Sequence, residues 1–352
     1  MSDETIPISF NDVIAEQKRK GLRVAIAVSI GFTLSVAFGA LVPFLGPLFA
    51  AQFLLGNSGP LPIAKTVGMA AVILVTGTFC MFLTSFLADN SMSFLMVLGL
   101  IYLMCFFVQA NGKGGSAIFL VLVVAVMVPL LGVLNRDLAD SILSILIVGV
   151  LSGTGLMWLA YVCIPEEAVA ATQVAPISGQ AHPYRRAMAS TAILLSTVAI
   201  CLTNDQLAAA LVIPITVASL LGQIDTGASA RAALGLTIVN LAGGILASLA
   251  YGILNLRPNL LFMFVILLVV ALLLGGRAAG RSTDAKMFAG ALTIFLILFG
   301  LGVSPLPGSA AESFSTRIVY VAAAILYTLL MTALLWPRLT RSGRKTKGAG
   351  IG

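Results

Sequence analysis

The chain has 352 residues, of which 59% are hydrophobic and only 9% carry charge, and its formal net charge is +7. A water-soluble domain carries charge on roughly 25% of its residues, so this composition excludes an ordinary soluble protein and indicates an integral membrane protein. The apolar residues form continuous runs of about 20 residues, which predicts membrane-spanning helices, whereas the strands of a transmembrane barrel alternate apolar and polar residues.

Residues 1–20 are polar and precede the first apolar run. We predict a short amphipathic helix on the cytoplasmic membrane surface, with one face made by Phe10, Val13, Ile14 and Gln17. The basic residues 18–20 followed by an apolar run are also typical of a cleaved signal peptide. Because residues 187–203 form a similar element inside the chain, we expect the first span to be retained.

Twelve apolar segments follow in two sets of six. The first set is predicted at 22–40, 41–55, 62–87, 91–110, 116–134 and 139–163, and the second at 187–203, 206–222, 230–254, 258–275, 284–303 and 316–337. The second segment of each set is interrupted, by Pro43, Gly46 and Pro47 in the first and by Pro214 in the second. Prolines free backbone groups, which membranes tolerate only beside protein or a water-filled cavity. Pro47 and Pro214 are therefore predicted to lie along a substrate pathway.

The two sets contain matching sequence around 54-LLGNSGPLPIAKTVG-68 and 220-LLGQIDTGASARAALG-235. The matched pairs, all 166 residues apart (220 − 54), are Leu54/Leu220, Leu55/Leu221, Gly56/Gly222, Ala64/Ala230, Lys65/Arg231 and Gly77/Gly243. Arg23 and Arg186 match at a separation of 163 (186 − 23). Because each set has an even number of segments, both have the same orientation. The predicted fold is an all-α polytopic membrane protein with two parallel six-helix repeats.

The positions of the basic residues predict how the chain crosses the membrane. Of the 20 lysines and arginines, all but Arg136, Arg257 and Arg317 fall on one side, which is the cytoplasmic side by the positive-inside rule. Both termini are then cytoplasmic, in a bacterial inner membrane. The predicted units are a segment at 1–20, a first repeat at 21–163, a linker at 164–185, a second repeat at 186–338 and a basic tail at 339–352. The excess positive charge follows this topology, and we expect contact with lipid but none with nucleic acid.

Four basic residues occupy matched positions in the two repeats. Arg23 and Arg186 begin the first helix of each set, and Lys65 and Arg231 begin the third. A lysine or arginine at a helix end commonly anchors the helix to lipid headgroups. As a group of four, these residues are predicted to bind an anionic substrate at the cytoplasmic mouth of a pathway between the repeats.

Three acidic residues near helix ends are candidates for proton coupling, namely Asp205, Asp225 and Asp140. Asp205 is the strongest candidate for proton coupling, because it follows Asn204 in a predicted tight turn between two short helices. It has no charged counterpart in the first set, near Gly39. The alternative for each is a solvated residue at the end of a helix.

The sequence contains no pattern of an enzyme or a cofactor site. The four cysteines stand singly, and the one histidine, His182, lies in the central linker. This arrangement argues against a metal site or a Cys/His nucleophile, and no Walker motif is present. We expect no cofactor and no enzymatic activity.

Two parallel six-helix sets, each with an Arg-led first helix, a Pro-interrupted second helix and a basic residue at the start of the third, resemble the fusaric acid resistance (FUSC-like) and aromatic acid exporter family. The resemblance covers about 20–340. It implies a proton-driven inner-membrane efflux component that exports aromatic or other organic acids. The implied partners are a HlyD-like periplasmic adaptor (membrane fusion protein) and an outer-membrane channel. The large exporters carry a sizeable cytoplasmic domain where this chain has only 164–185, which indicates a compact branch.

Two other functions remain open at this point. Plant aluminium-activated malate transporters are similar in building an anion pathway from two six-helix units, so an anion channel is one alternative. A membrane scaffold without transport activity, or a lipid-modifying enzyme, is the other, although acid–base residues for such an enzyme are lacking. Proton-dependent concentrative flux would separate an exporter from a channel. The sequence is also compatible with homo-oligomers.

Overall fold

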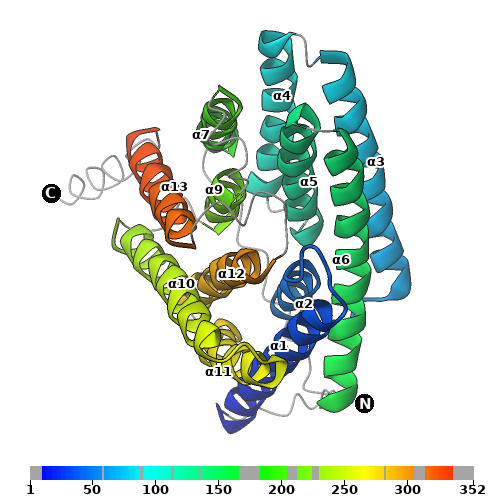
Figure 1. Ribbon diagram of the computed structural model, residues 1–352. Helices are drawn as coiled ribbons and strands as arrows, with labels where there is room; N and C mark the ends of the chain where they lie inside the picture. The colour runs from blue at the N-terminus through cyan, green and yellow to red at the C-terminus, as the bar shows by residue number, and fades with distance from the viewer. Residues whose placement is uncertain are drawn as a thin grey trace, which may run out of the picture.

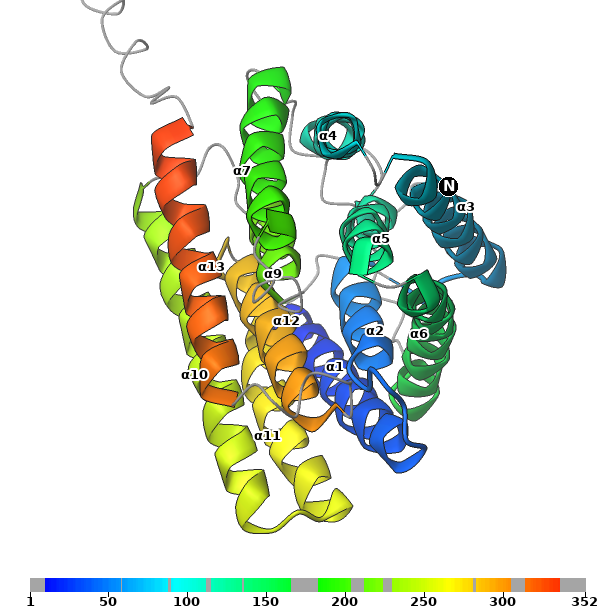
Figure 2. The ribbon, with the colours of Figure 1, turned by 45° about the horizontal axis from the view of Figure 1, so that its top comes forward.

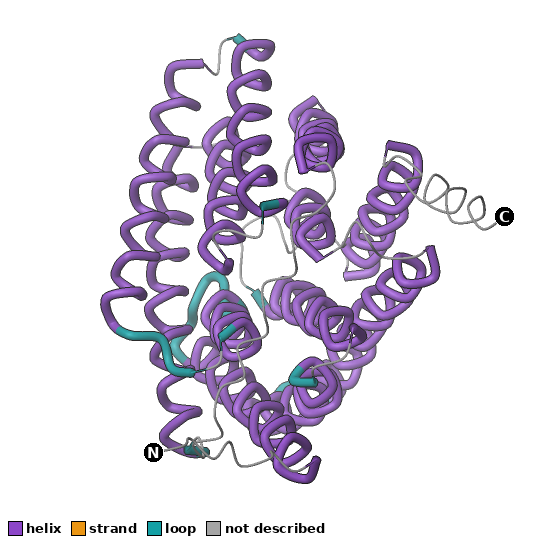
Figure 3. The backbone as a smooth tube through the Cα atoms, turned by 180° about the vertical axis from the view of Figure 1, so that it is seen from behind, coloured by secondary structure: helices purple, strands orange, loops and turns teal. Residues whose placement is uncertain are grey.

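In the computed structural model of the protein, all the regular secondary structure of the described residues is helical (Figure 3). The described residues are 10–57, 59–87, 90–111, 115–134, 136–165, 183–203, 212–223, 230–280, 283–304 and 314–335. They form 12 helices. The helices of the first half are α1 (Phe10–Ala37), α2 (Leu45–Gly56), α3 (Ile63–Leu87), α4 (Ser91–Ala110), α5 (Gly115–Leu134) and α6 (Arg136–Cys163). Those of the second half are α7 (Pro183–Thr203), α9 (Val212–Gln223), α10 (Ala230–Leu256), α11 (Leu260–Ala278), α12 (Thr283–Val303) and α13 (Phe314–Leu335).

Outside the N-terminus, the described helix boundaries agree with the sequence prediction to within four residues, and the predicted start of the segment 206–222 lies outside the described residues. A separate short surface helix was expected within 1–20, but α1 runs without interruption from Phe10 to Ala37. The reason is local: the stretch from Ala15 to Lys20 consists of strong helix formers and contains no proline, so the polar segment and the first apolar run form one helix.

Eight of the described helices are long and apolar enough to cross a membrane, namely α1, α3, α4, α6, α7, α10, α11 and α12. The outward faces of several of them carry large apolar side chains, such as Phe86 (77% exposed), Met92 (78%) and Leu256 (81%). Exposed apolar surface of this extent is typical of contact with lipid. The protein is therefore a multi-pass membrane protein.

Two helices, α5 and α12, form the buried centre of the molecule. Every side chain of 122–130 in α5 and of 291–299 in α12 is buried. A helix that is apolar on all sides is surrounded by other protein elements. Figure 1 shows α12 enclosed by α2, α9, α10 and α11, while α5 lies between α4 and α6.

The helices pack in a regular set of pairs. The main pairs between distant parts of the chain are α1 with α11 and α4 with α7, and both are visible in Figure 2. Within the first half α3 packs against α5 and α2 against α6, and within the second half α10 packs against α12 and α9 against α13.

The pair α2 and α6 is held at close distance by glycines. A Cβ atom added at Gly153 would lie 2.8 Å from the Phe49 Cβ and 2.9 Å from the Gly46 carbonyl oxygen, and one at Gly149 would lie 3.1 Å from the Leu45 Cβ. The sequence predicts that Gly149 and Gly153 form a small-residue packing face. The structure confirms this prediction, because the face meets α2 and not lipid.

A proline inside α5 is compensated by a side chain of α4. Pro129 lacks an N–H group, so the carbonyl of Ala125, four residues earlier, has no partner within the helix. The hydroxyl of Tyr102, which is 0% exposed, donates a hydrogen bond to this carbonyl at 3.1 Å. The freed backbone group is thereby satisfied inside the membrane.

Candidate functional site

The centre of the bundle contains the short helix α2 and a matching stretch of α9. Each has 12 described residues, and for α2 this length corresponds to about 18 Å, whereas the hydrocarbon core is about 30 Å thick. The residues on both sides of α9, 204–211 and 224–229, lie outside the described part of the chain. Both α2 and α9 contact the two central helices, α5 and α12, and Figure 1 shows α2 and α9 in the interior of the molecule. Incomplete helices at membrane depth are typical of sites where a substrate or ion is bound.

The two prolines predicted beside a pathway lie near the described starts of α2 and α9. Pro47 is the third residue of α2 and Pro214 the third residue of α9, and both are buried. The N–H groups of the first turn have no partner within a helix, so proline costs nothing at this position. Pro47 therefore lies in the first turn of α2 instead of interrupting it, and Pro214 is the third described residue of α9, whose preceding residues lie outside the described part of the chain.

A polar contact joins α2 to α12 in this centre. The Gln52 amide donates a hydrogen bond from Nε2 to Thr293 Oγ1 at 2.9 Å, and the Thr293 hydroxyl donates to the Ala289 carbonyl at 3.0 Å. Thr216 and Ser219 of α9 are also buried. Gln52 is the one amide in the α2 sequence LGPLFAAQFLLG, a signal that the sequence offers and that our prediction did not use.

Asn240 is a second polar residue in the interior that the sequence analysis missed. It lies on α10, it is 0% exposed, and neither its Nδ2 nor its Oδ1 atom has a hydrogen-bond partner among the described residues. A buried amide without partners costs about 1–3 kcal/mol. The arrangement is suited to a water molecule or a polar group of a ligand at this position.

Two basic residues of α1 bind the ends of other helices. The Arg23 side chain is only 3% exposed, donates from Nε to the Ile164 carbonyl at 2.8 Å, and lies 4.4 Å from the centre of the Tyr161 ring. Lys20 donates from Nζ to the Leu55 carbonyl at 3.1 Å. These cations therefore stabilise the C-terminal ends of α6 and α2, where the helix dipole is negative.

The other basic candidates differ in their surroundings. Lys65 is exposed in the first turn of α3, and Arg186 is half-buried near the start of α7. The backbone of Arg231 belongs to α10, but its side chain lies outside the described residues. We call the end of the bundle with Lys18, Lys20, Arg23, Lys65 and Arg277 the basic end.

The acidic candidates lie largely beyond the described part of the chain. Asp205 and Asp225 are both outside it, and Asp140 is described only as part of the α6 backbone, without its side chain. Among the residues that are described, no three His, Cys, Asp or Glu side chains form a group that could hold a metal ion.

Comparison with known proteins gives one family match. Residues 20–159 match the family "Protein of unknown function (DUF2955)". These residues begin in α1 and end in α6, so the match covers the first set of six helices. No curated protein and no solved structure matches the chain. The match and the apolar helices together indicate a family of membrane proteins.

Proposed function

We propose that the protein is an inner-membrane exporter of organic anions, of the FUSC-like and aromatic acid exporter type, built from two parallel six-helix repeats. The observation that carries this proposal is the short helix α2, which lies inside the bundle against α5 and α12, together with the described part of α9, which contacts the same two helices. Helices that do not cross the membrane leave polar chain ends at its interior, and transporters use such ends to bind substrates and ions.

The pattern of helix pairs supports the two-repeat architecture. The first helix of each set packs against the fourth helix of the other set, as α1 does with α11 and α7 with α4. In both sets the third helix packs against the fifth and the second against the sixth. The two short helices also occupy the same place in their sets, with a proline at the third position of each. The family match to 20–159 is consistent with one such unit.

In this proposal the substrate anion enters from the basic end, which is cytoplasmic. Lys65, Arg186 and Arg231 attract it, while Arg23 in the present conformation holds the end of α6. Gln52, Thr293 and Asn240 supply uncharged polar groups in the interior. Asp205, Asp225 and Asp140 are the candidates for proton coupling. A HlyD-like periplasmic adaptor and an outer-membrane channel are the proposed partners.

Transport into inverted membrane vesicles tests the activity. Vesicles that contain the protein should accumulate an aromatic carboxylate against its gradient when the interior is acidified, and accumulation should stop when a protonophore removes the pH difference. Asp205→Asn should abolish the accumulation and leave substrate binding intact. Asp225 and Asp140 are the other candidates for proton coupling, so Asp225→Asn and Asp140→Asn are tested in the same way.

Two results would contradict parts of the proposal. Downhill flux without any response to the pH difference would identify an anion channel. Absence of flux for a panel of aromatic, aliphatic and amphipathic anions, from vesicles in which the protein is folded, would contradict transport of organic anions altogether.

A further inference from the structure

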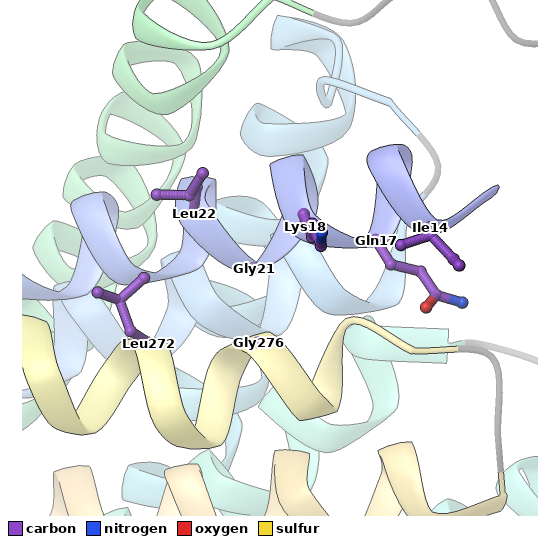
Figure 4. A pocket seen from close by; sticks show the side chains of 7 residues that line it. All are labelled: Ile14, Gln17, Lys18, Gly21, Leu22, Leu272 and Gly276. Atoms are coloured by element: carbon purple, nitrogen blue, oxygen red, sulfur yellow. The ribbon is translucent and has the colours of Figure 1, made fainter. Parts of the chain in front are cut away.

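A groove lies at the basic end between α1 and α11 (Figure 4). Its volume is about 420 Å³. Apolar side chains from both helices line it, namely Ile14, Leu22 and Leu272, and Gln17 and Lys18 provide polar groups. In Figure 4 the Leu272 side chain points from α11 toward α1. None of the residues that line the groove belongs to α2 or α9.

The groove exists because two glycines bring α1 and α11 together. A Cβ atom added at Gly21 would lie 2.7 Å from the Gly276 Cα, so the two backbones touch at this point. A Cβ atom added at Gly276 would meet no atom within 4 Å. Gly276 therefore leaves an empty volume beside a rigid helix contact, and this volume is part of the groove.

The charges at the groove are complementary to an anion. Lys18 is exposed and makes no hydrogen bond or ion pair within the described part of the chain. Arg277, next to Gly276, is exposed but does not line the groove, and its guanidinium lies 5.2 Å from the centre of the Phe288 ring of α12. The one carboxylate of this part of α1, Glu16, is not among the residues that line the groove.

The depth of the groove matches the boundary between lipid headgroups and acyl chains. It includes the first turns of the apolar span Ile14–Ala37 and the last turns of the span Leu260–Ala278. Lys18 lies nearer the bundle end than Leu22 on α1, and Gly276 lies nearer it than Leu272 on α11, while the apolar Ile14 lies farther out than Lys18. From Lys18 inward the groove has the order of a phospholipid, with phosphate outside and hydrocarbon inside.

We propose that this groove binds one anionic phospholipid. Its phosphate group lies against Lys18 and Gln17, and one acyl chain lies between Leu22 and Leu272. A basic pocket between helices on the positively charged side is suited to an anionic headgroup, and the apolar floor excludes a free phosphate ion as the preferred occupant. The test of this site does not require transport activity.

Native mass spectrometry of the full chain tests the site. The protein is released from nanodiscs with equal amounts of phosphatidylglycerol and phosphatidylcholine, and the retained lipids are counted. We expect one phosphatidylglycerol to remain in preference to phosphatidylcholine. Lys18→Gln should lower this preference about fivefold, the contribution of one lysine near an anionic lipid surface. Gly276→Leu should abolish retention, because the new side chain fills the groove without a clash.

Matched variants separate the site from general effects. Gly68→Leu introduces the same side chain at an exposed glycine of α3 where a Cβ meets nothing within 4 Å. Arg257→Gln removes one exposed positive charge after α10. Both should retain the lipid as the parent protein does. Equal retention by Gly276→Leu and the parent would overturn the site. Equal retention of the two lipids would overturn the assignment to an anionic headgroup, and stronger binding of inorganic phosphate than of lipid would overturn the assignment to a phospholipid.

Discussion

At the scale of single residues, two basic residues with the same predicted role differ in their surroundings. Arg23 and Lys65 were both predicted to attract an anion, yet Arg23 is buried and bound to the end of α6, while Lys65 is exposed. Burial decides the difference, since a buried guanidinium requires hydrogen-bond partners and an exposed ammonium is solvated by water.

The two residues should therefore respond differently to loss of charge. Arg23→Gln leaves the Ile164 carbonyl and the Tyr161 ring without their partner, so we expect the unfolding free energy to fall by about 1.5–3 kcal/mol. Lys65→Gln should change it by less than about 0.5 kcal/mol. Thermal unfolding in detergent measures both. Equal midpoints for the two variants would show that the Arg23 contacts contribute nothing to stability.

Two glycines of α6 that are two residues apart provide a matched pair. Gly153→Leu forces a side chain into α2, with a Cβ 2.8 Å from Phe49 and 2.9 Å from the Gly46 carbonyl oxygen, so we expect a loss of at least about 1–3 kcal/mol and a lower folded yield. Gly155→Leu should be tolerated, because its Cβ meets no atom within 4 Å. The monodisperse fraction in size-exclusion chromatography and the unfolding midpoint provide the comparison. A stable Gly153→Leu protein would mean that α2 and α6 can separate without cost.

At the scale of the helix, irregular positions are stabilised by a neighbouring helix. Pro129 removes one hydrogen bond from α5, and Tyr102 of α4 replaces it. The carboxyl ends of α2 and α6 are bound by Lys20 and Arg23 of α1. The Ala125 carbonyl is buried, so its compensating donor is part of the fold, and Lys20 and Arg23 satisfy the carbonyls of Leu55 and Ile164 at the basic end.

A double-mutant cycle measures the link between α4 and α5. Tyr102→Phe removes the donor to the Ala125 carbonyl and should lower stability by about 0.5–2 kcal/mol. In the background of Pro129→Ala, the new N–H group of residue 129 can bond to the same carbonyl, so Tyr102→Phe should then cost less. Identical costs in both backgrounds would show that Tyr102 acts only through packing.

At the scale of the whole molecule, the proposed repeat relates Lys65 and Arg231 across the interface of the two halves. Each stands at the start of the third helix of its set. If both attract one anion, their contributions to its capture are coupled, and the attraction weakens as salt screens it.

Lys65→Gln combined with Arg231→Gln should therefore raise the substrate concentration for half-maximal transport well beyond either single change. The effect should be largest at low ionic strength, because a Debye length of about 30 Å at 0.01 M salt falls to about 10 Å at 0.1 M. Uptake into inverted vesicles measures it, with cysteine accessibility as the control for orientation. Parental uptake by the double variant at every salt concentration would identify both residues as membrane anchors.

The sequence by itself determined the class of protein and, to within four residues, the boundaries of most described helices. Membrane helices depend on the length of a continuous apolar run, which is a local property, so the long runs near 62–87, 91–110 and 284–303 correspond closely to α3, α4 and α12. The sequence also predicted the small-residue packing face of Gly149 and Gly153, which the contacts with α2 confirm. The continuity of α1 was missed because hydropathy marks where the membrane begins and not where a helix begins.

Only the tertiary structure decided which helices meet and which polar groups are enclosed. Gln52 and Thr293 are 241 residues apart, and the α1 contact at Gly21 and Gly276 joins opposite halves of the chain. Periodicity along one helix carries no information about the partner at such a distance. The burial of Arg23 and Asn240 likewise depends on neighbouring helices. In a membrane, apolar side chains are well solvated by lipid on any face of a helix. Packing and the hydrogen bonding of polar groups therefore decide which face points inward.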